Sequence, residues 1–327
     1  MKRKIVFAAM VAAVFPACEK KEIENTVPEA EPVTLEVKIP VVPTKVTDVG
    51  NEDAVSSYQI FVYSNDDGML EAYMAVSGGT SAARVQCTTG SKEIVVLANA
   101  PDLKTMTSLS QLKETRSRLE HNGVGNLVME GSKTVVLTAS STVEIPLKRL
   151  VAKVRLKNVT LDFDSESYAD MDFEITSVYL INVPADRKYL TLASDSPAPA
   201  EWYNKLKYES DSRYDALLKD VVNSGPIDSY DTEHVFYTYP NPCVNDDYSD
   251  VWSERPTRLV VEARLGGMPY YYPISLPVLK QNTVYDVSLT VTRPGKTEVN
   301  DEMQKYEETF NIKVLDWENG YVLEEIL

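Results

Sequence analysis

Apolar and polar residues alternate strictly in a short segment near the N-terminal end of the chain. Val33, Leu35, Val37 and Ile39 are apolar, and every residue between them is polar. A period of two places the four apolar side chains on one face of a β-strand. The segment is therefore predicted to be a strand that needs a facing sheet to bury that side.

Strand-like runs separated by turn residues make up most of the remaining chain. In the first half they are Tyr58–Tyr63, Met69–Val76, Ala82–Cys87, Glu93–Ala98, Thr134–Thr138 and Thr142–Leu147. A second set starts at Leu150 and includes Phe173–Asn182, Val235–Tyr239, Arg258–Arg264, Tyr270–Leu276, Thr283–Thr292 and Glu307–Leu315. Many short strands at this spacing predict an all-β protein of the β-sandwich type.

Two segments carry a helical pattern instead. Ser108 precedes Gln111 by three residues in the manner of a capping box, and leucines follow at helical spacing as far as Leu119. Between Ser212 and Val222, apolar residues are spaced for one face of a second helix. The expected fold class is therefore all-β, with one or two short helices inserted.

The N-terminal residues have the features of an export signal. Three basic residues precede an apolar run, Ile5–Phe15, which is too short to anchor the chain across a bilayer. We expect residues 1–17 to be a signal peptide that is cut between Ala17 and Cys18. The small residue before Cys18 resembles a bacterial lipobox, although Phe15 stands where a leucine-like residue is usual. Lipidation of the Cys18 thiol, with acyl chains such as palmitate, is favoured over an ordinary signal peptide that happens to end beside a cysteine.

The composition changes after Cys18, and a second set of strands begins after Arg149. Residues 18–32 are rich in Glu, Lys and Pro and are predicted to be a lipidated tether. The two sets of strands then divide into an N-terminal β-sandwich domain, 33–149, and a C-terminal one, 150–327.

Charge and residue counts exclude several functions. The chain has 33 basic and 49 acidic residues, a formal net charge of −16, so nucleic acid is not an expected partner. Only two histidines and three cysteines are present, and the sequence lacks the P-loop, G-x-S-x-G and H-E-x-x-H motifs. We expect no cofactor, no metal, no catalytic residues and no enzyme activity, although two carboxylates would suffice for a glycosidase.

Some features leave alternatives open. The acidic stretch Asp162–Asp172 does not fit an EF-hand, because Ser167 stands in place of glycine, so it is a solvated loop or a calcium site of another type. The 19 tyrosines favour structural packing over a carbohydrate surface. The two histidines, His121 and His234, favour surface or cap roles. Cys87 and Cys243 could pair, but their separation in sequence does not decide it.

These features together resemble the FimA/Mfa1-type fimbrillins of the Bacteroidales, which are lipoprotein precursors of type V pilus subunits. The residues that carry the resemblance occur in the family's order: the lipobox, Tyr58–Tyr63, Val95–Pro101, Leu127–Gly131, Leu147–Leu156, Tyr285–Val287 and Val314–Trp317. The resemblance implies two transthyretin-like β-sandwiches.

It also implies a mode of assembly. In the family, a trypsin-like protease cuts after a basic residue in the loop that follows the first strand, and a strand from the next subunit fills the vacated groove. The removable strand here would be Val33–Ile39, and the cut would fall between Lys45 and Val46. No arginine lies between Cys18 and Arg84, so either the protease accepts lysine or this subunit is not cut.

The C-terminal tail is a candidate donor strand. Tyr321, Leu323 and Leu327 share one face of an extended segment, interrupted by two glutamates. An incoming strand of this kind supplies main-chain hydrogen bonds and side chains for apolar pockets. The alternative is that the tail closes its own domain as a last strand.

The expected function is that of a structural, adhesive subunit of a cell-surface fimbrium, lipid-anchored at the outer membrane as a precursor. The expected partners are other pilin subunits, a trypsin-like processing protease, outer-membrane lipid through Cys18, and ligands on host or bacterial surfaces. The alternatives are an uncut anchor or tip subunit, or a glycan-binding surface lipoprotein.

Overall fold

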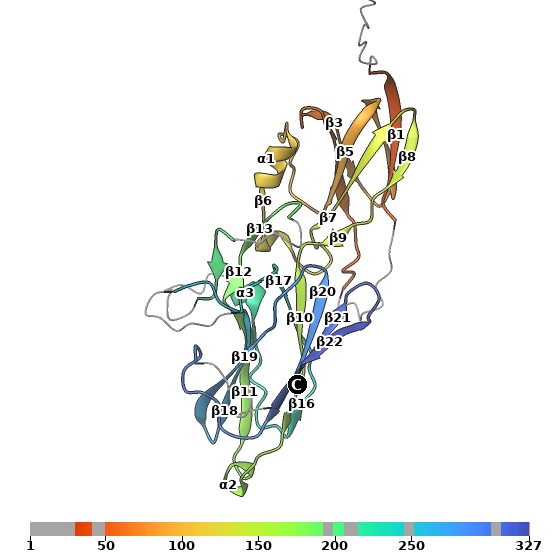
Figure 1. Ribbon diagram of the computed structural model, residues 1–327. Coiled ribbons are helices and arrows are strands. Elements are labelled where there is room, and N and C mark those ends of the chain that lie inside the picture. Colours follow the sequence, from red (N-terminus) through yellow and green to blue (C-terminus); the bar gives the residue numbers. More distant parts are fainter. Residues whose placement is uncertain are drawn as a thin grey trace, which may run out of the picture.

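A computed structural model describes residues 30–40, 50–191, 199–205, 215–244, 252–301 and 309–326. It has two β-rich lobes stacked end to end (Figure 1). The signal peptide, Cys18, Lys45, Val46 and Leu327 lie outside the described residues. The predicted all-β class, with two β-sandwiches, is confirmed by the sheets described below.

The N-terminal lobe has a five-stranded and a three-stranded sheet. The larger sheet has the order β3 (Leu70–Ser77), β2 (Ser57–Ser64), β5 (Gly90–Ala98), β7 (Met129–Leu137), β9 (Lys148–Arg149). The smaller sheet has the order β4 (Ala82–Thr88), β1 (Pro32–Lys38), β8 (Ser141–Glu144). The apolar inner faces of these two sheets form the part of the core that lies in the N-terminal lobe.

The C-terminal lobe has two larger sheets. One has the order β16 (Ser229–Tyr230), β10 (Ala152–Leu161), β20 (Thr283–Val291), β21 (Thr309–Asp316), β22 (Val322–Ile326), and β17 (His234–Thr238) also pairs with β10. The other has the order β15 (Lys219–Val221), β11 (Phe173–Ile181), β18 (Arg258–Leu265), β19 (Met268–Ser275). The strand β12 (Val183–Pro184) pairs with β14 (Trp202–Tyr203) in a small separate sheet.

Strand β2 is buried on both faces, which explains why its sequence is almost continuously apolar. The segment after β5 passes close to it: Gln59 donates a hydrogen bond to the Pro101 carbonyl (2.8 Å), and the Tyr63 hydroxyl donates one to the Met106 carbonyl (3.2 Å). Helix α1 (Leu109–Glu114) follows this segment. Its predicted N-cap is present, because the Ser108 hydroxyl accepts a hydrogen bond from the Gln111 amide (3.2 Å).

Three local predictions need correction. The first helix was predicted to continue as far as Leu119, but α1 ends at Glu114, and Leu119 begins the 3-10 turn η1 (Leu119–His121) instead. The predicted helix Ser212–Val222 is helical only over α3 (Asp215–Leu218) among the residues described there, and β15 follows at once, paired with β11. Pairing with the edge of that sheet overrides the helical spacing. Strand β7 begins at Met129, five residues before the predicted start, and contains Gly131. A Cβ at Gly131 would clash with the Pro146 carbonyl oxygen, so glycine permits this close approach of two chain segments.

The two lobes are joined by more than the chain connection from β9 to β10. Strand β6 (Arg116–Arg118), from the N-terminal half, pairs antiparallel with β13 (Asp186–Lys188) from the C-terminal half. We propose to keep the domain division between Arg149 and Leu150, because β9 belongs to a sheet of the first lobe and β10 to a sheet of the second.

Candidate assembly site

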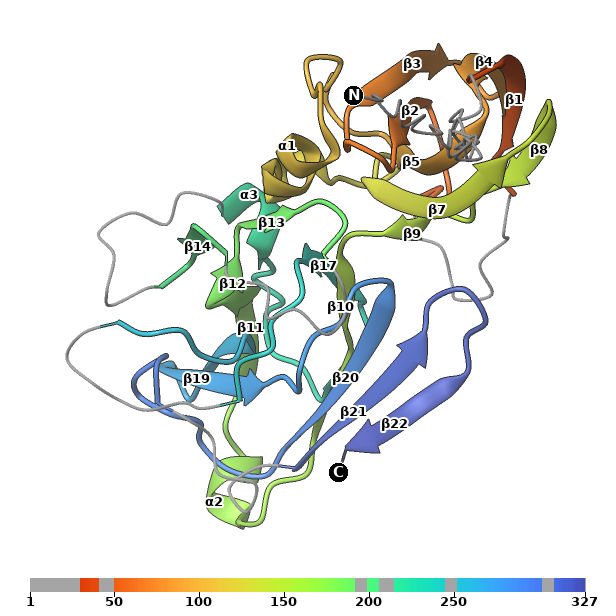
Figure 2. The same ribbon diagram turned by 45° about the horizontal axis from the view of Figure 1, so that its top comes forward.

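Strand β1 occupies the middle of the three-stranded sheet. It pairs antiparallel with β4, where Leu35 faces Val85, and parallel with β8, where Leu35 faces Ser141. Figure 2 shows β1 beside β4 and β8 on the outer side of the N-terminal lobe. Removal of β1 would therefore leave two separated strand edges with unpaired main-chain groups.

The alternating pattern of β1 fits this position. Leu35 and Val37 are fully buried, and Val33 and Ile39 are nearly so. Complete burial of such a side chain contributes about 1.5–3 kcal/mol, so the four together hold the strand firmly. The groove that they fill is lined by apolar residues of the core.

The outer face of β1 carries polar contacts with both neighbouring strands. The Thr142 hydroxyl donates a hydrogen bond to the Glu36 carboxylate (3.0 Å), and the Arg84 guanidinium lies 3.3 Å from the same group. The Thr142 hydrogen bond and the charge of Arg84 lower the pKa of Glu36 below its ordinary value. Glu36 therefore favours the paired state of β1 when it is ionised.

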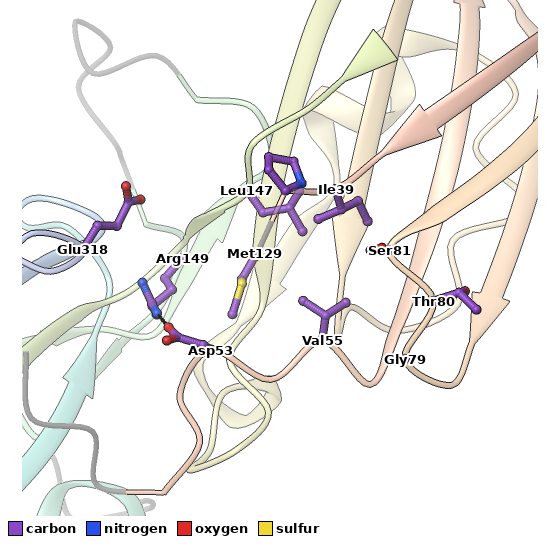
Figure 3. A pocket seen from close by; sticks show the side chains of 11 residues that line it. Ile39, Asp53, Val55, Gly79, Thr80, Ser81, Met129, Leu147, Arg149 and Glu318 are labelled. Carbon is purple, nitrogen blue, oxygen red and sulfur yellow. Dashed lines mark hydrogen bonds and ion pairs between the residues drawn. The ribbon is translucent and has the colours of Figure 1, made fainter. Parts of the chain in front are cut away.

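A pocket lies directly beyond the C-terminal end of β1 (Figure 3). Next to it lie two main-chain hydrogen bonds of the described part of the sheet: the Ile39 amide donates to the Ser81 carbonyl (2.8 Å), and the Ile145 amide donates to the Lys38 carbonyl (2.9 Å). The pocket is lined by Ile39, Pro40, Asp53, Val55, Gly79, Thr80, Ser81, Met129, Leu147, Arg149 and Glu318. It therefore begins where β1 leaves the sheet.

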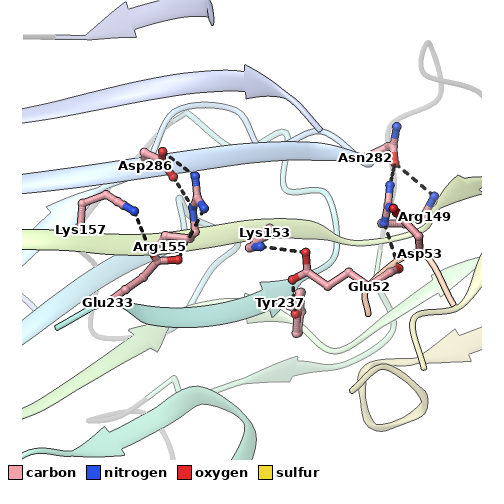
Figure 4. Close-up of polar contacts among 10 residues, drawn as sticks. All are labelled: Glu52, Asp53, Arg149, Lys153, Arg155, Lys157, Glu233, Tyr237, Asn282 and Asp286. Atoms are coloured by element: carbon pink, nitrogen blue, oxygen red, sulfur yellow. Dashed lines mark hydrogen bonds and ion pairs between the residues drawn. The ribbon is translucent and has the colours of Figure 1, made fainter. Parts of the chain in front are cut away.

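The chain next enters the described region at Gly50, and the residues that follow contact the C-terminal lobe. Glu52 and Lys153 are both fully buried and lie 2.8 Å apart from carboxylate oxygen to ammonium nitrogen (Figure 4). The Tyr237 hydroxyl donates to the same carboxylate. Burial lowers the pKa of Lys153, and the hydrogen bond and charge of Glu52 oppose that shift.

A second ion pair lies next to the first. Arg149 pairs with Asp53 and also donates a hydrogen bond to the Asn282 side chain (3.0 Å). The Arg149 guanidinium lies 4.5 Å from the centre of the buried Trp317 ring. The segment before β2 is thus fixed by ion pairs to β10 and β9. Arg149 of β9 in turn contacts Asn282, directly before β20, and Trp317, directly after β21. We name Glu52, Asp53, Arg149, Lys153 and Trp317 the junction cluster.

No motif in the sequence predicts the junction cluster. Two acids near a glycine, as in Gly50–Asp53, are usually interpreted as part of a polar loop. Leu147–Leu156 and Val314–Trp317 were singled out as motifs but not placed together. The available signal was the presence of Arg149 and Lys153 among the apolar residues Leu150, Val151, Ala152 and Val154, since buried cations need partners.

The C-terminal tail forms β22, an edge strand paired antiparallel with β21. Tyr321 and Leu323 are 65% and 59% exposed, so their side chains contribute little to the core in this arrangement. In the structure, the tail is therefore the last strand of a sheet in its own domain, which was one of the two alternatives. The role of Tyr321, Leu323 and Leu327 as a donor strand stays a prediction.

The acidic stretch Asp162–Asp172 does not form a ligand site in the described residues. In the acidic stretch, Asp164 pairs with Arg293 (3.0 Å), and a short helix, α2 (Glu166–Ala169), replaces part of the expected loop. Across the described ranges, no three histidine, cysteine or acidic side chains gather as metal ligands. In the same residues, no helix has the length and apolar character needed to cross a membrane.

The two histidines differ. His121 accepts a hydrogen bond from the Arg118 amide (3.1 Å) at the start of the 3-10 turn η1 (Leu119–His121), as a cap residue does. His234 is not a surface or cap residue. It is buried between the Asp220 carboxylate (2.7 Å) and the Tyr230 hydroxyl (2.8 Å), because strands β15 and β16 meet β17 there.

Cys87 and Cys243 are both free. Cys87 lies on β4 directly opposite Val33 of β1, and burial raises the pKa of its thiol. Among the three consecutive tyrosines, Tyr272 is fully buried and donates a hydrogen bond to the Arg293 carbonyl (3.2 Å). Tyr272 therefore has the packing role that was favoured over sugar binding.

The geometry defines a class of protein: two β-sandwiches in series, the first of which is completed by the first strand of the described residues. A family model described as "Major fimbrial subunit protein (FimA)" matches residues 33–161, from β1 to the end of β10. The predicted resemblance to the fimbrillins is confirmed, and this part of the chain carries the FimA family signature. Among curated proteins, none matches the chain.

Solved structures share the fold over nearly the whole chain. A candidate cell adhesion protein from Bacteroides eggerthii has a TM-score of 0.67 at 18% identity, covering 88% of this chain and 96% of that one. A second one, from Parabacteroides distasonis, has a TM-score of 0.65 at 17% identity, with coverages of 89% and 100%. Fimbrilin (FimA) from Porphyromonas gingivalis has a TM-score of 0.63 at 18% identity, with coverages of 87% and 97%.

Proposed function

We propose that this chain is a structural subunit of a cell-surface pilus that assembles by exchange of its first strand. The single observation that carries the proposal is the position of β1, which is the middle strand of its sheet and yet lies at the start of the described chain. After a cut between β1 and β2, no chain connection would join β1 to the rest of its sheet, so another strand could take its place. The family match over residues 33–161 supports the same function.

The route to assembly follows from the residues around β1. The precursor would be exported, lipidated at Cys18 and held at the outer membrane. A protease would cut after Lys45, and β1 would depart with the tether. A strand from another subunit would then restore the main-chain hydrogen bonds to β4 and β8 and refill the apolar groove.

The junction cluster supports cleavage within residues 41–49 without loss of the rest of the domain. Glu52 and Asp53 begin only a few residues after Lys45. Glu52 is ion-paired to Lys153 of the C-terminal lobe, and Asp53 is ion-paired to Arg149 of β9. After a cut at Lys45, β2 and the segment before it would stay in place. The vacated groove would therefore keep its shape for the incoming strand.

A second candidate role is an uncut anchor or tip subunit. Two observations favour it: β22 is already paired with β21, and the sequence has no arginine between Cys18 and Arg84. A subunit that keeps β1 would have no open groove and would end a fibre rather than extend it.

Intact mass and N-terminal sequencing of the protein taken from the cell surface distinguish the two roles. A new N-terminus at Val46 is the result expected for a polymerising subunit. An acylated Cys18 on an uncut chain would instead establish the anchor role, or a lipoprotein outside the fibre. A Lys45→Gln variant is the matched control, because it should retain the full chain only if the cut falls at that residue.

A further inference from the structure

We infer that the pocket beyond Ile39 is a fifth side-chain site of the strand-accepting groove, and that it receives an aliphatic residue of a strand donated by another subunit. This inference rests on the proposed function, because it describes the strand that replaces β1. It adds a fifth inward position to the four that Val33, Leu35, Val37 and Ile39 occupy in β1.

The pocket lies directly beyond the inward-facing side chains of β1. The four inward side chains of β1 end at Ile39, and Ile39 and Pro40 form one wall of the pocket. Departure of β1 removes that wall, so the pocket becomes continuous with the groove. In a strand of period two, the next inward position lies two residues beyond the place of Ile39. An incoming strand that follows the path of β1 would direct that side chain to the pocket.

Val55, Met129 and Leu147 supply apolar walls, while Asp53 and Glu318 lie toward the C-terminal lobe (Figure 3). Arg149 is already engaged by Asp53, and Asn282 donates a hydrogen bond to Glu318 (2.9 Å). An acidic side chain would meet two carboxylates, whereas a valine or leucine would cover the apolar walls. The pocket therefore selects an aliphatic residue.

Within the described residues, the main-chain hydrogen bonds along β1 extend as far as Ile39 and Lys38, and a residue in the pocket would add side-chain burial to them. Burial of one aliphatic side chain strengthens binding by about tenfold or more. The pocket would thus determine how far a donor strand must extend past the Ile39 position, and so its register.

The test uses the folded full chain with a sequence-specific protease site placed within residues 43–49. After cutting, β1 is held only by non-covalent contacts and can be displaced by fluorescent peptides, whose binding is followed by anisotropy. Three peptides copy the chain itself: residues 31–39, residues 31–41, and residues 31–41 with Val41→Asp. The 31–41 peptide is expected to bind about tenfold more tightly than 31–39. The Val41→Asp peptide is expected to bind no more tightly than 31–39.

Two protein variants complete the design. Val55→Phe, which narrows the pocket, should remove the advantage of the longer peptide while leaving the affinity for 31–39 unchanged, which reports an intact groove. Val136→Phe is the matched control, because Val136 is 72% exposed on β7, and it should retain the advantage. Equal affinities of all three peptides would overturn the inference that the pocket receives a side chain, while the proposal of strand exchange would still stand. Failure of every peptide to displace β1 would overturn the proposed function and the pocket together.

Discussion

The carboxylate of Glu52 lies 2.8 Å from the ammonium group of Lys153, and neither side chain is exposed to solvent. Glu52 belongs to the segment that enters β2 in the first lobe, and Lys153 belongs to β10 in the second (Figure 4). One buried ion pair therefore links the loop where processing is proposed to the junction between the two lobes.

Breaking this pair should destabilise the protein strongly. Lys153→Met leaves the Glu52 carboxylate buried without its main counter-charge, and we expect the free energy of unfolding to fall by about 3–5 kcal/mol. Urea unfolding at neutral pH measures it. The double variant Glu52→Leu/Lys153→Met should recover much of the loss, because no buried charge remains.

The exposed pair Lys313 and Glu325 provides the control. These groups lie 3.6 Å apart, and both side chains are about half exposed. Lys313→Met should cost less than about 1 kcal/mol. Equal losses in Lys153→Met and Lys313→Met would show that burial of the first pair has no energetic importance.

The side chain of Leu35 should be the main anchor of β1. Leu35→Ala removes a fully buried side chain and leaves a cavity, so we expect a loss of about 2–5 kcal/mol. Thr34→Ala, on the outer face of the same strand, should cost less than about 1 kcal/mol. Thermal or urea unfolding of both variants tests the difference. Similar losses would contradict the assignment of the inward face.

Acid should loosen β1 through Glu36. The folded-state pKa of Glu36 lies below its ordinary 4.5, mainly because Thr142 donates a hydrogen bond to it and Arg84 is near. A lowered folded-state pKa gives stability that is present above about pH 4.5 and lost as the pH falls through the folded-state pKa. In the cleaved protein, release of β1 should therefore accelerate in that acid range.

Glu36→Gln supplies the comparison for the acid experiment. Its release rate should be faster at neutral pH and should change less with acid than that of the unmodified protein, measured by peptide exchange between pH 3 and 7. Parallel pH profiles for the two proteins would mean that other carboxylates, and not Glu36, govern the release.

Cys87 should report the departure of β1. It is buried opposite Val33, and burial raises the pKa of its thiol. Loss of β1 should expose the thiol and lower that pKa, and each unit of decrease increases the thiolate fraction about tenfold. Alkylation by iodoacetamide in a Cys18→Ser background, followed by mass spectrometry, should therefore be slow in the intact protein and faster once β1 is released.

Cys243 is the internal reference for this measurement. It follows β17 in the C-terminal half of the chain, outside the sheet that contains β1, so its alkylation rate should not change. An equal increase at both thiols would indicate general unfolding instead of strand release.

Local signals in the sequence were enough to predict much of the fold. The alternation from Val33 to Ile39 gave a strand with the correct buried face, because period two needs only local geometry. Ser108 and Gln111 placed the start of α1, because an N-cap satisfies amides within three residues of itself. These features depend on neighbours in the chain and therefore can be read without a fold.

Segments whose partners lie far away in the sequence were predicted less well. Residues Lys219–Val221 have helical spacing but form strand β15, because the open edge of β11 offers main-chain hydrogen bonds there. His234 lies between Asp220 and Tyr230 only because three strands meet. In each case the decisive contact comes from another strand.

The sequence by itself determined the all-β class, the inward face of β1 and the family resemblance. Only the tertiary structure decided that β1 lies between β4 and β8, that a pocket follows Ile39, and that Glu52 meets Lys153 across 101 residues of chain. The physical reason is that alternation fixes which side of a strand is apolar, whereas strand order and buried charge pairing depend on segments brought together only when the whole chain folds.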